Sequence, residues 1–367
     1  MSAGPLRLVV EANDGPARAG VVTTPRGSYR TPAFMPVGTR GSVRTLSAAD
    51  LESLGVEVML ANTYHLMLRP GADVVASLGG LPAFMGWPGQ VLTDSGGYQV
   101  FSLSPAVDDE GVTFRSTYDG STHRLTPEGA VAVQEQLGAD IQMVLDVCPG
   151  LPAPAEVIRR AVDRTAAWAA RARRAHRREG QAIFGIVQGG VDVHLRGESA
   201  RRTVELDFDG YGIGGLSVGE PRDQMLEALA AALTELPADR PRYLMGVGDP
   251  IGLVEAVALG VDQFDCVLPT RLARHGSVLT SAGRLQLRNA GFARDDGPLD
   301  DTCSCVVCAR WSRAYLRHLL TVGEPSAARL VTLHNLAWLL QFVGDIGRAV
   351  RGGTLDELRR ATASTWT

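Results

Sequence analysis

The chain has 367 residues, of which 45% are hydrophobic and 21% are charged, and its formal net charge at pH 7 is −4. This length suits one large domain or two ordinary ones, and the slight negative charge excludes a protein that binds nucleic acid over its whole surface. No apolar run approaches the roughly 20 residues of a membrane helix, and no signal pattern opens the chain, so we expect a soluble, cytoplasmic protein.

All 36 basic residues are arginine, which excludes Schiff-base lysine chemistry and P-loop phosphate transfer. Short apolar segments alternate with helical patterns along the whole chain. The expected strands are 34–37, 56–61, 90–93, 140–145, 182–187, 210–214, 242–246 and 261–266. The expected helices are 126–138, 154–178, 192–206, 221–235 and 250–259. Eight strand–helix units with apolar strands predict an α/β fold of the (β/α)₈ barrel type, a TIM barrel.

Two segments outside the barrel pattern, before residue 30 and at 277–288, are expected to form β-hairpins, the second with its turn at Ala282-Gly283.

Three of the five cysteines cluster late in the chain, at Cys303, Cys305 and Cys308, and His334 follows. Thiolates in this C-x-C-x₂-C spacing can converge on one tetrahedral Zn²⁺ with an imidazole as fourth ligand. His318 is the rival fourth ligand, and a chance grouping of three small buried residues is the alternative to a metal site. We therefore expect one catalytic barrel domain over 1–367 with a zinc-binding subdomain at 270–345.

Polar residues follow several of the expected strands. Asp94, Asp146 and Asp265 end the third, fourth and eighth strands, while Asn62 and Gln188 end the second and fifth. Active sites of such barrels lie at the C-terminal ends of the strands, so these side chains should converge on one face. A single aspartate there could be a loop cap, but three of them favour a catalytic site.

The carboxylates suit glycosyl transfer with a purine. An oxocarbenium-like transition state requires a carboxylate nucleophile and a second group that moves protons. An ionised carboxylate can accept both N–H donors on the Watson–Crick edge of guanine, and Gln188 or the Gly215 N–H can donate to its O6. Tyr98 and Met245 can flank the ring.

Several motifs occur in the order found in one enzyme family. They are NTYHLMLRPG at 62–71, DSGGYQVFSLS at 94–104, GIVQGG at 185–190, GGLSVGE at 214–220, YLMGVG at 243–248 and FDCVLPTR at 264–271. With the cysteine–histidine set, they make the chain resemble tRNA-guanine transglycosylases from about residue 6 to 350. The resemblance implies an irregular (β/α)₈ barrel with a zinc subdomain.

The resemblance also implies an activity: a pentosyl transfer that replaces guanine at the wobble position of a tRNA anticodon with a 7-deazaguanine, in queuosine modification. In this family pattern Asp265 is the nucleophile that forms a covalent intermediate with the ribose. Asp94 is the general acid and base, and Asn62 supports it. The product retains its configuration at the sugar carbon.

The remaining roles implied by the resemblance concern binding. The residues that bind the base edge are Asp146, Gln188 and Gly215, those that stack on the ring are Tyr98 and Met245, and those that contact its 7-substituent are Leu216 and Glu220. Arg271 and Arg274 bind RNA phosphates. One structural Zn²⁺ is held by Cys303, Cys305, Cys308 and His334, and the family is commonly homodimeric.

Val218 favours 7-aminomethyl-7-deazaguanine as the incoming base, with the larger base queuine as the alternative. Val147, Pro149 and Leu272 depart from the usual family pattern at the pocket rim and along the RNA path. Two other functional classes are alternatives: a non-catalytic partner subunit, which would lose Asp94 or Asp265, and a retaining glycoside hydrolase, which would not explain the zinc set.

Overall fold

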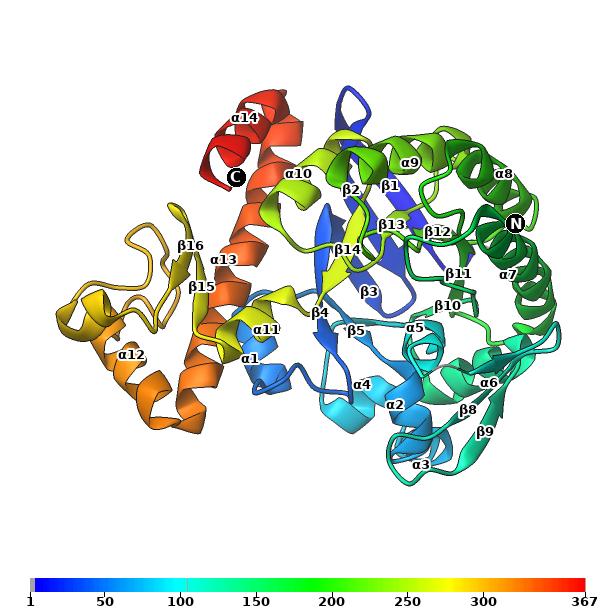
Figure 1. Cartoon of the computed structure of the whole chain (residues 1–367), viewed down its shortest axis with the longest axis horizontal. Helices are drawn as coiled ribbons and strands as arrows, with labels where there is room; N and C mark the ends of the chain where they lie inside the picture. The colour runs from blue at the N-terminus through cyan, green and yellow to red at the C-terminus, as the bar shows by residue number, and fades with distance from the viewer. Residues whose placement is uncertain (1–3, 104, 367) are drawn as a thin grey trace.

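The computed structural model describes residues 4–103 and 105–366, and a closed barrel of parallel strands lies at its centre (Figure 1). The strands, in order around the barrel, are β4 (Ala33–Gly38), β5 (Val58–Ala61), β6 (Gln90–Thr93), β10 (Ile141–Met143), β11 (Ala182–Val187), β12 (Gly210–Ile213), β13 (Arg242–Leu244) and β14 (Gln263–Cys266). Phe264 of β14 pairs with Phe34 of β4, which closes the barrel. Each strand overlaps a predicted segment, so the predicted (β/α)₈ barrel is confirmed.

The five predicted helices are present outside the strands (Figure 1). They are α6 (Pro127–Leu137), α7 (Ala155–Ala175), α8 (Val193–Val204), α9 (Arg222–Glu235) and α10 (Pro250–Ala258). In α6 the Thr126 side chain accepts a hydrogen bond from the Gly129 N–H, and Gly138 ends the helix with φ +71°. The strands are covered on both faces, which explains why every residue of β11 is buried.

Short helices occupy loops near the barrel. They are α1 (Ala48–Ser53), α2 (Thr63–Leu68), α3 (Ala72–Ser77), α4 (Gly80–Met85), α5 (Gly97–Phe101) and α11 (Leu268–Arg274). The C-terminal part adds the 3₁₀ helix η1 (Ala290–Arg294), α12 (Arg313–Val322), α13 (Pro325–Gly352) and α14 (Leu355–Thr365). Within the described part of the chain, no helix combines the length and apolar character needed to cross a membrane.

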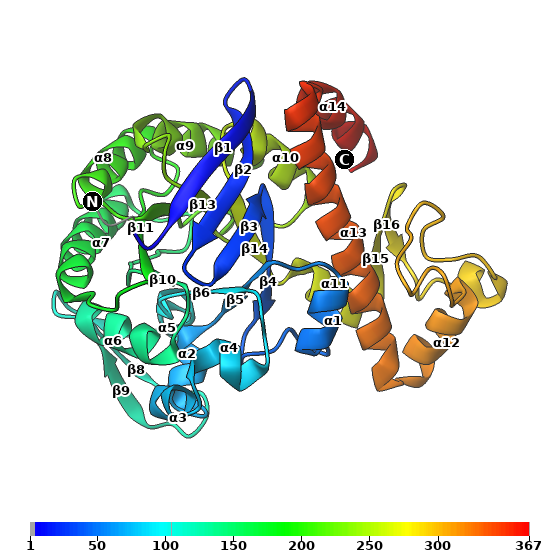
Figure 2. The same ribbon diagram turned by 180° about the vertical axis from the view of Figure 1, so that it is seen from behind.

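A three-stranded antiparallel sheet covers the N-terminal end of the barrel (Figure 2). It consists of β1 (Arg7–Asp14), β2 (Ala17–Thr24) and β3 (Gly27–Thr31). Buried Arg18 forms an ion pair with Asp262, at the start of β14, and Tyr29 hydrogen-bonds to Gln263. The hairpin predicted before residue 30 is therefore extended by a third strand.

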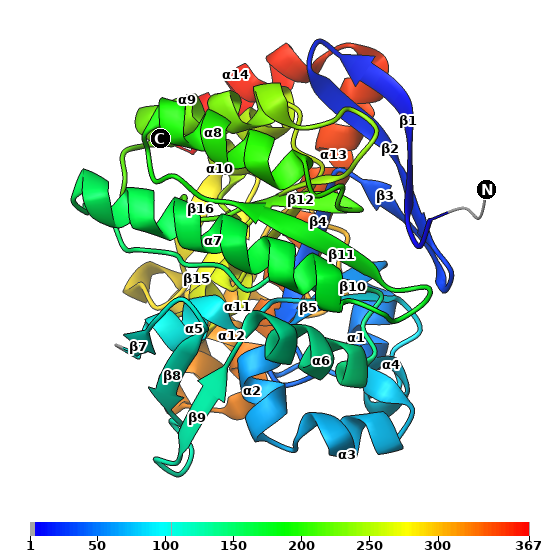
Figure 3. The ribbon, with the colours of Figure 1, turned by 90° about the vertical axis from the view of Figure 1, so that its right-hand side faces the viewer.

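A second antiparallel sheet, which the sequence analysis did not predict, lies at the opposite end of the molecule (Figure 3). It consists of β7 (Ala106–Val107), β8 (Val112–Arg115) and β9 (Thr122–Leu125), and we call it the flap sheet. Phe114 and Val112 of this sheet pack with Tyr64 of α2 in a small buried cluster. The flap sheet thus rests beside the loops that follow β5 and β6.

The second predicted hairpin, β15 (Ser277–Thr280) and β16 (Gly283–Gln286), is confirmed, but its predicted turn is wrong. Gly283 pairs with Thr280, so the turn is Ser281-Ala282. This hairpin, η1, α12 and the start of α13 project from one side of the barrel (Figure 1). They lie within 270–345, whereas α13 continues to Gly352 and contacts β1, β2 and β4. The predicted domain of 1–367 also includes residues 1–3, 104 and 367, which lie outside the described ranges.

Candidate active site

A cavity of about 580 Å³ opens at the C-terminal ends of the barrel strands. Asp94, Asp146 and Asp265 all line it, although they follow three different strands. The other predicted site residues that line it are Asn62, Tyr98, Gly215, Leu216, Met245 and Arg271. Gln188, Glu220 and Arg274 do not line the cavity but lie next to residues that do.

Asp94 follows β6 and is buried among hydrogen-bond donors. Its Oδ1 accepts from the Thr63 N–H at 2.8 Å and the Gly96 N–H at 3.2 Å, and the Asn62 amide donates to Oδ2. Burial raises the pKa of Asp94 to about 6, and these donors limit the rise. A carboxyl group with a pKa in this range can both donate and accept a proton near neutral pH.

Asp265 ends β14 and has a different environment. The Tyr243 hydroxyl and the Gly246 N–H both donate to its Oδ1, at 2.6 and 2.8 Å. Its Oδ2 has no hydrogen-bond partner among the described residues. Burial raises the pKa of Asp265, while the two donors oppose the rise. Burial and Asp265 raise the pKa of Tyr243 well above its ordinary value, so the phenol stays neutral and remains a donor.

Asp146 follows β10 and contacts Gln188 of β11's C-terminal loop. The Gln188 amide nitrogen donates to Oδ2 of Asp146 at 2.6 Å. Burial raises the pKa of Asp146 to about 6. The Gln188 side-chain oxygen is buried without a hydrogen-bond partner, and an added Cβ at Gly215 would lie 2.2 Å from it. Glycine, at φ +66°, is therefore required at position 215.

The two thiols in the cavity wall are poor nucleophiles. Cys148 and Cys266 both line the cavity. Burial raises the pKa of Cys148 to about 12 and that of Cys266 to about 11. Since the thiolate is the reactive form of cysteine, both side chains stay protonated and unreactive near neutral pH.

Arg196, which the sequence analysis did not single out, fixes the two glycine-rich loops of the wall. It projects from α8, is 0% exposed, and makes no salt bridge with any residue in the described ranges. Its guanidinium donates to the carbonyl oxygens of Gly190 at 2.7 Å, Gly214 at 2.7 Å and Gly215 at 3.0 Å. Burial lowers its pKa to about 10, so it remains charged at neutral pH.

Glu220 stabilises the loop that follows β12. Its carboxylate accepts hydrogen bonds from the Ser217 N–H and, at 2.9 Å, the Val218 N–H. Ser217 has a φ of +60°, which is rare for a residue with a side chain. Glu220 thus holds the backbone that places Leu216 and Val218 in the cavity wall.

The two predicted RNA-binding arginines lie on α11, directly after Asp265. Arg271 is exposed and lines the cavity, whereas Arg274 is half-buried and donates to the Thr270 carbonyl at 3.2 Å. Burial, with Arg44 and Arg271 nearby, lowers the pKa of Arg274. Arg44, Arg271 and Arg274 therefore lie near one another, and Arg271 alone among them lines the cavity.

Cys303, Cys305, Cys308 and His334 form a cluster that can hold a metal ion. Their potential ligand atoms lie within 4.8 Å of one another. His334 Nε2 lies 2.8 Å from the Leu279 carbonyl, to which it can donate a proton. Nδ1 then faces the sulfur atoms of Cys305 and Cys308, at 3.5 and 3.2 Å. The rival ligand His318 is exposed on α12 and lies outside this cluster.

The cysteine–histidine cluster is joined to α11 and β15 through Asn335, the neighbour of His334. The Asn335 amide donates to the carbonyl oxygens of Pro269 in α11 and Ser277 in β15, both at 3.1 Å. Its oxygen accepts from the Leu279 N–H at 3.0 Å. The segment that carries His334 is therefore hydrogen-bonded to α11, the helix on which Arg271 and Arg274 lie.

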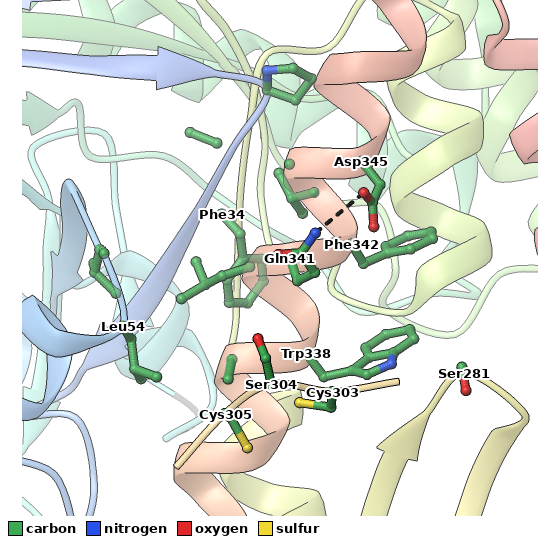
Figure 4. Close-up of a pocket in the computed structure, with 18 of the residues that line it drawn as sticks. Phe34, Leu54, Ser281, Cys303, Ser304, Cys305, Trp338, Gln341, Phe342 and Asp345 are labelled. Carbon is green, nitrogen blue, oxygen red and sulfur yellow. Dashed lines mark hydrogen bonds between the residues drawn. The ribbon is translucent and has the colours of Figure 1, made fainter. Parts of the chain in front are cut away.

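A larger cavity, of about 1050 Å³, lies on another part of the molecule, against α13 (Figure 4). It is lined by Phe34, at the start of β4, and by stacked Trp338 and Phe342, whose ring centroids are 5.4 Å apart. Asp345 in its wall is bound to Gln341 and Arg348. Asp94, Asp146 and Asp265 do not line this cavity, which lies near the N-terminal end of the barrel.

Comparison with known proteins agrees with the resemblance seen in the sequence. The family model described as "Queuine tRNA-ribosyltransferase" matches residues 13–367. Proteins of that name from Desulforudis audaxviator and Moorella thermoacetica are 56% and 53% identical over 344 residues, which is 93% of this chain and 91% and 92% of theirs. One from Symbiobacterium thermophilum is 53% identical over 95% of this chain and 88% of its own length. The chain therefore belongs to the queuine tRNA-ribosyltransferase family.

Proposed function

We propose that the chain is a tRNA-guanine transglycosylase, which exchanges guanine at the wobble position of tRNA for a 7-deazaguanine in queuosine modification. The observation that carries this proposal is the convergence of Asp94, Asp146 and Asp265 on one cavity, each with a different set of hydrogen bonds. Three carboxylates can then serve three roles: proton transfer, base recognition and nucleophilic attack.

The exchange proceeds by double displacement. Asp265 attacks the ribose C1′ through the oxygen that Tyr243 and Gly246 leave free, the bond from C1′ to guanine N9 breaks, and Asp94 protonates the departing base. Asp94 then takes the N9 proton of the incoming base, whose nitrogen attacks C1′ and releases Asp265. Two inversions give retention. Asn62 orients Asp94 through its amide.

The base is recognised by the groups around Asp146. Ionised Asp146 accepts hydrogen bonds from the ring N–H and the exocyclic amine of guanine, while Gln188 and the Gly215 N–H donate hydrogen bonds to its O6. Exposed Tyr98 and half-buried Met245 stack on the ring. Leu216 faces the 7-substituent, and Glu220 fixes the loop that carries it.

The preferred incoming base is 7-aminomethyl-7-deazaguanine, because Val218 occupies space in the wall. Queuine is the alternative. The carboxylates Asp94 and Asp265 argue against a non-catalytic partner subunit, and the guanine-reading groups argue against a glycoside hydrolase. The RNA partner is a tRNA with guanine at the wobble position, and Arg271 and Arg274 bind its phosphates.

The cysteine–histidine cluster fits Zn²⁺, whose usual structural site is four thiolate and imidazole ligands in a tetrahedron. Four protein ligands leave no open position for water, so the role of zinc is structural. Asn335 transmits its effect to α11.

We also propose a cytoplasmic homodimer joined near this cluster. Tyr315 and Val322 of α12 are 45% and 60% exposed, and such exposed apolar side chains favour association.

Incorporation of labelled guanine into tRNA tests this function. The purified chain should exchange guanine into a tRNA with guanine at position 34 but not into the same tRNA with adenine there. Unlabelled 7-aminomethyl-7-deazaguanine should compete more strongly than queuine. Equal incorporation into both tRNAs, or none into either, would overturn the proposal.

A further inference from the structure

A group of three side chains beside the cavity wall has no role in the exchange chemistry. Arg40 follows β4, Arg69 follows α2, and Tyr118 lies in the turn between β8 and β9 of the flap sheet. The guanidinium carbons of Arg40 and Arg69 lie 5.3 and 4.7 Å from the centroid of the Tyr118 ring. We call these three residues the rim cluster.

The rim cluster is connected directly to the active-site cavity through His65. The Tyr118 hydroxyl lies 2.9 Å from His65 Nδ1, and the two rings meet edge to face. His65 lines the cavity that holds Asp94 and Asp265. His65 therefore joins the rim cluster to the wall of the cavity.

The charge of the rim cluster is not compensated by the protein. Arg40 and Arg69 are exposed, and neither forms a salt bridge within residues 4–103 and 105–366. Arg44, Arg271 and half-buried Arg274 likewise form no salt bridge with any described residue, and all five arginines follow the adjacent strands β14, β4 and β5. Arginines without acidic partners beside a cavity attract a polyanion.

Tyr118 gives the cluster its geometry. Guanidinium groups are attracted to the face of an aromatic ring, which offsets the repulsion between the two arginines. Because Tyr118 is itself bonded to His65, the ring cannot swing freely with the flap turn. Two exposed arginines, which would otherwise sample many rotamers, are thereby held close to each other with their N–H donors open to solvent.

We propose that Arg40 and Arg69, held by Tyr118, bind phosphodiester oxygens of the RNA beside the wobble nucleotide, while Arg271 binds the backbone on the side of the cavity formed by α11. The inference rests on the proposed function, which identifies the substrate as RNA. The flap sheet is then part of the substrate-binding surface through Tyr118.

Binding of full-length tRNA to the intact protein tests the proposal. We would measure the affinity by filter binding at several salt concentrations for R40Q, R69Q and the control R7Q, whose arginine is exposed on β1 at the far end of the barrel. R40Q and R69Q should each weaken binding and lower the slope of log affinity against log salt by roughly 1, since one phosphate contact is lost. R7Q should change neither quantity.

Two substitutions of Tyr118 separate its ring from its hydroxyl. Y118F keeps the ring and should retain most of the affinity, whereas Y118L should weaken binding several-fold and raise the KM for tRNA. Thermal unfolding of each variant shows whether the fold is kept. If the wild type exchanges guanine while R40Q and R69Q bind tRNA like R7Q, the rim cluster does not bind RNA. If the wild type neither binds tRNA nor exchanges guanine, the proposed function itself fails.

Discussion

Asp146→Asn should make the protein more stable at neutral pH while it abolishes base recognition. Asp146 is 5% exposed, and burial raises its pKa from an ordinary value of 3.8 to about 6. Each tenfold change in proton affinity is worth about 1.4 kcal/mol, so keeping this carboxylate ionised costs the folded state up to roughly 3 kcal/mol. Asparagine has nearly the same shape, and its amide can keep a hydrogen bond to Gln188.

The sign of the effect fixes its pH window. When the pKa of a carboxyl group is higher in the folded than in the unfolded protein, its proton stabilises the fold. This stabilisation is complete at a pH below the pKa of the unfolded protein, and it is lost as the pH rises through the pKa of the folded protein. The advantage of Asp146→Asn should therefore be near zero below pH 4, grow between pH 4 and 6, and reach its plateau of up to roughly 3 kcal/mol above pH 6.

The assay is urea unfolding of both proteins at pH 4, 6 and 8, with Asp296→Asn as the control at an exposed carboxyl. Addition of guanine should stabilise the wild type at pH 8 and leave Asp146→Asn unchanged. Equal stability of the two proteins at pH 8, or a gain that persists at pH 4, would refute the argument that desolvation of Asp146 controls its pKa.

Three further predictions follow from the same structure. Affinity for free guanine should fall about tenfold per pH unit below pH 6, as Asp146 takes up a proton; a flat profile of the guanine inhibition constant would contradict this. Arg196→Met should lower the free energy of unfolding, since each buried carbonyl left unpaired costs roughly 1–3 kcal/mol, and should raise the KM for guanine because the loop of Gly215 loses its anchor; added guanidinium ion should restore part of both losses, and an unchanged stability would contradict this role. Metal analysis should find about one zinc per chain, and Cys305→Ser should lower both zinc content and the melting temperature; loss of activity in a fully folded, zinc-loaded variant would argue for a catalytic metal instead.

The barrel could be predicted from the sequence because each strand is a short, largely apolar run, and several of these runs are followed by a polar residue. In a closed parallel barrel the C-terminal ends of the strands meet at one face, which is why Asp94, Asp146 and Asp265 could be placed together without any knowledge of the loops. The cysteine–histidine cluster, which can hold a metal ion, was predictable because three of its members are close in sequence.

The flap sheet was missed because its strands carry little local pattern. β7 has two residues, and β8 and β9 have four each. Their stability depends on Val112 and Phe114, which pack against Tyr64 about 50 residues earlier in the chain. Such a sheet forms because of tertiary packing, which no window of the sequence contains.

Arg196 and the rim cluster were missed for a related reason. An arginine within a helix is ordinary in a chain whose basic residues are all arginine. The burial of Arg196 depends on carbonyl groups from two separate loops, and the pairing of His65 with Tyr118 spans 53 residues. The tertiary structure alone shows that these side chains meet.

The most direct test of the account is whether Asp265 becomes bonded to RNA. Wild-type protein, incubated with tRNA and a competing base and then denatured, should give a slower band on a denaturing gel, and mass spectrometry should locate the bond at Asp265. Asp265→Asn should give no such band, since an amide is a poor nucleophile. A band that persists in Asp265→Asn and disappears in Asp94→Asn would assign the nucleophile to Asp94 and contradict the proposed roles.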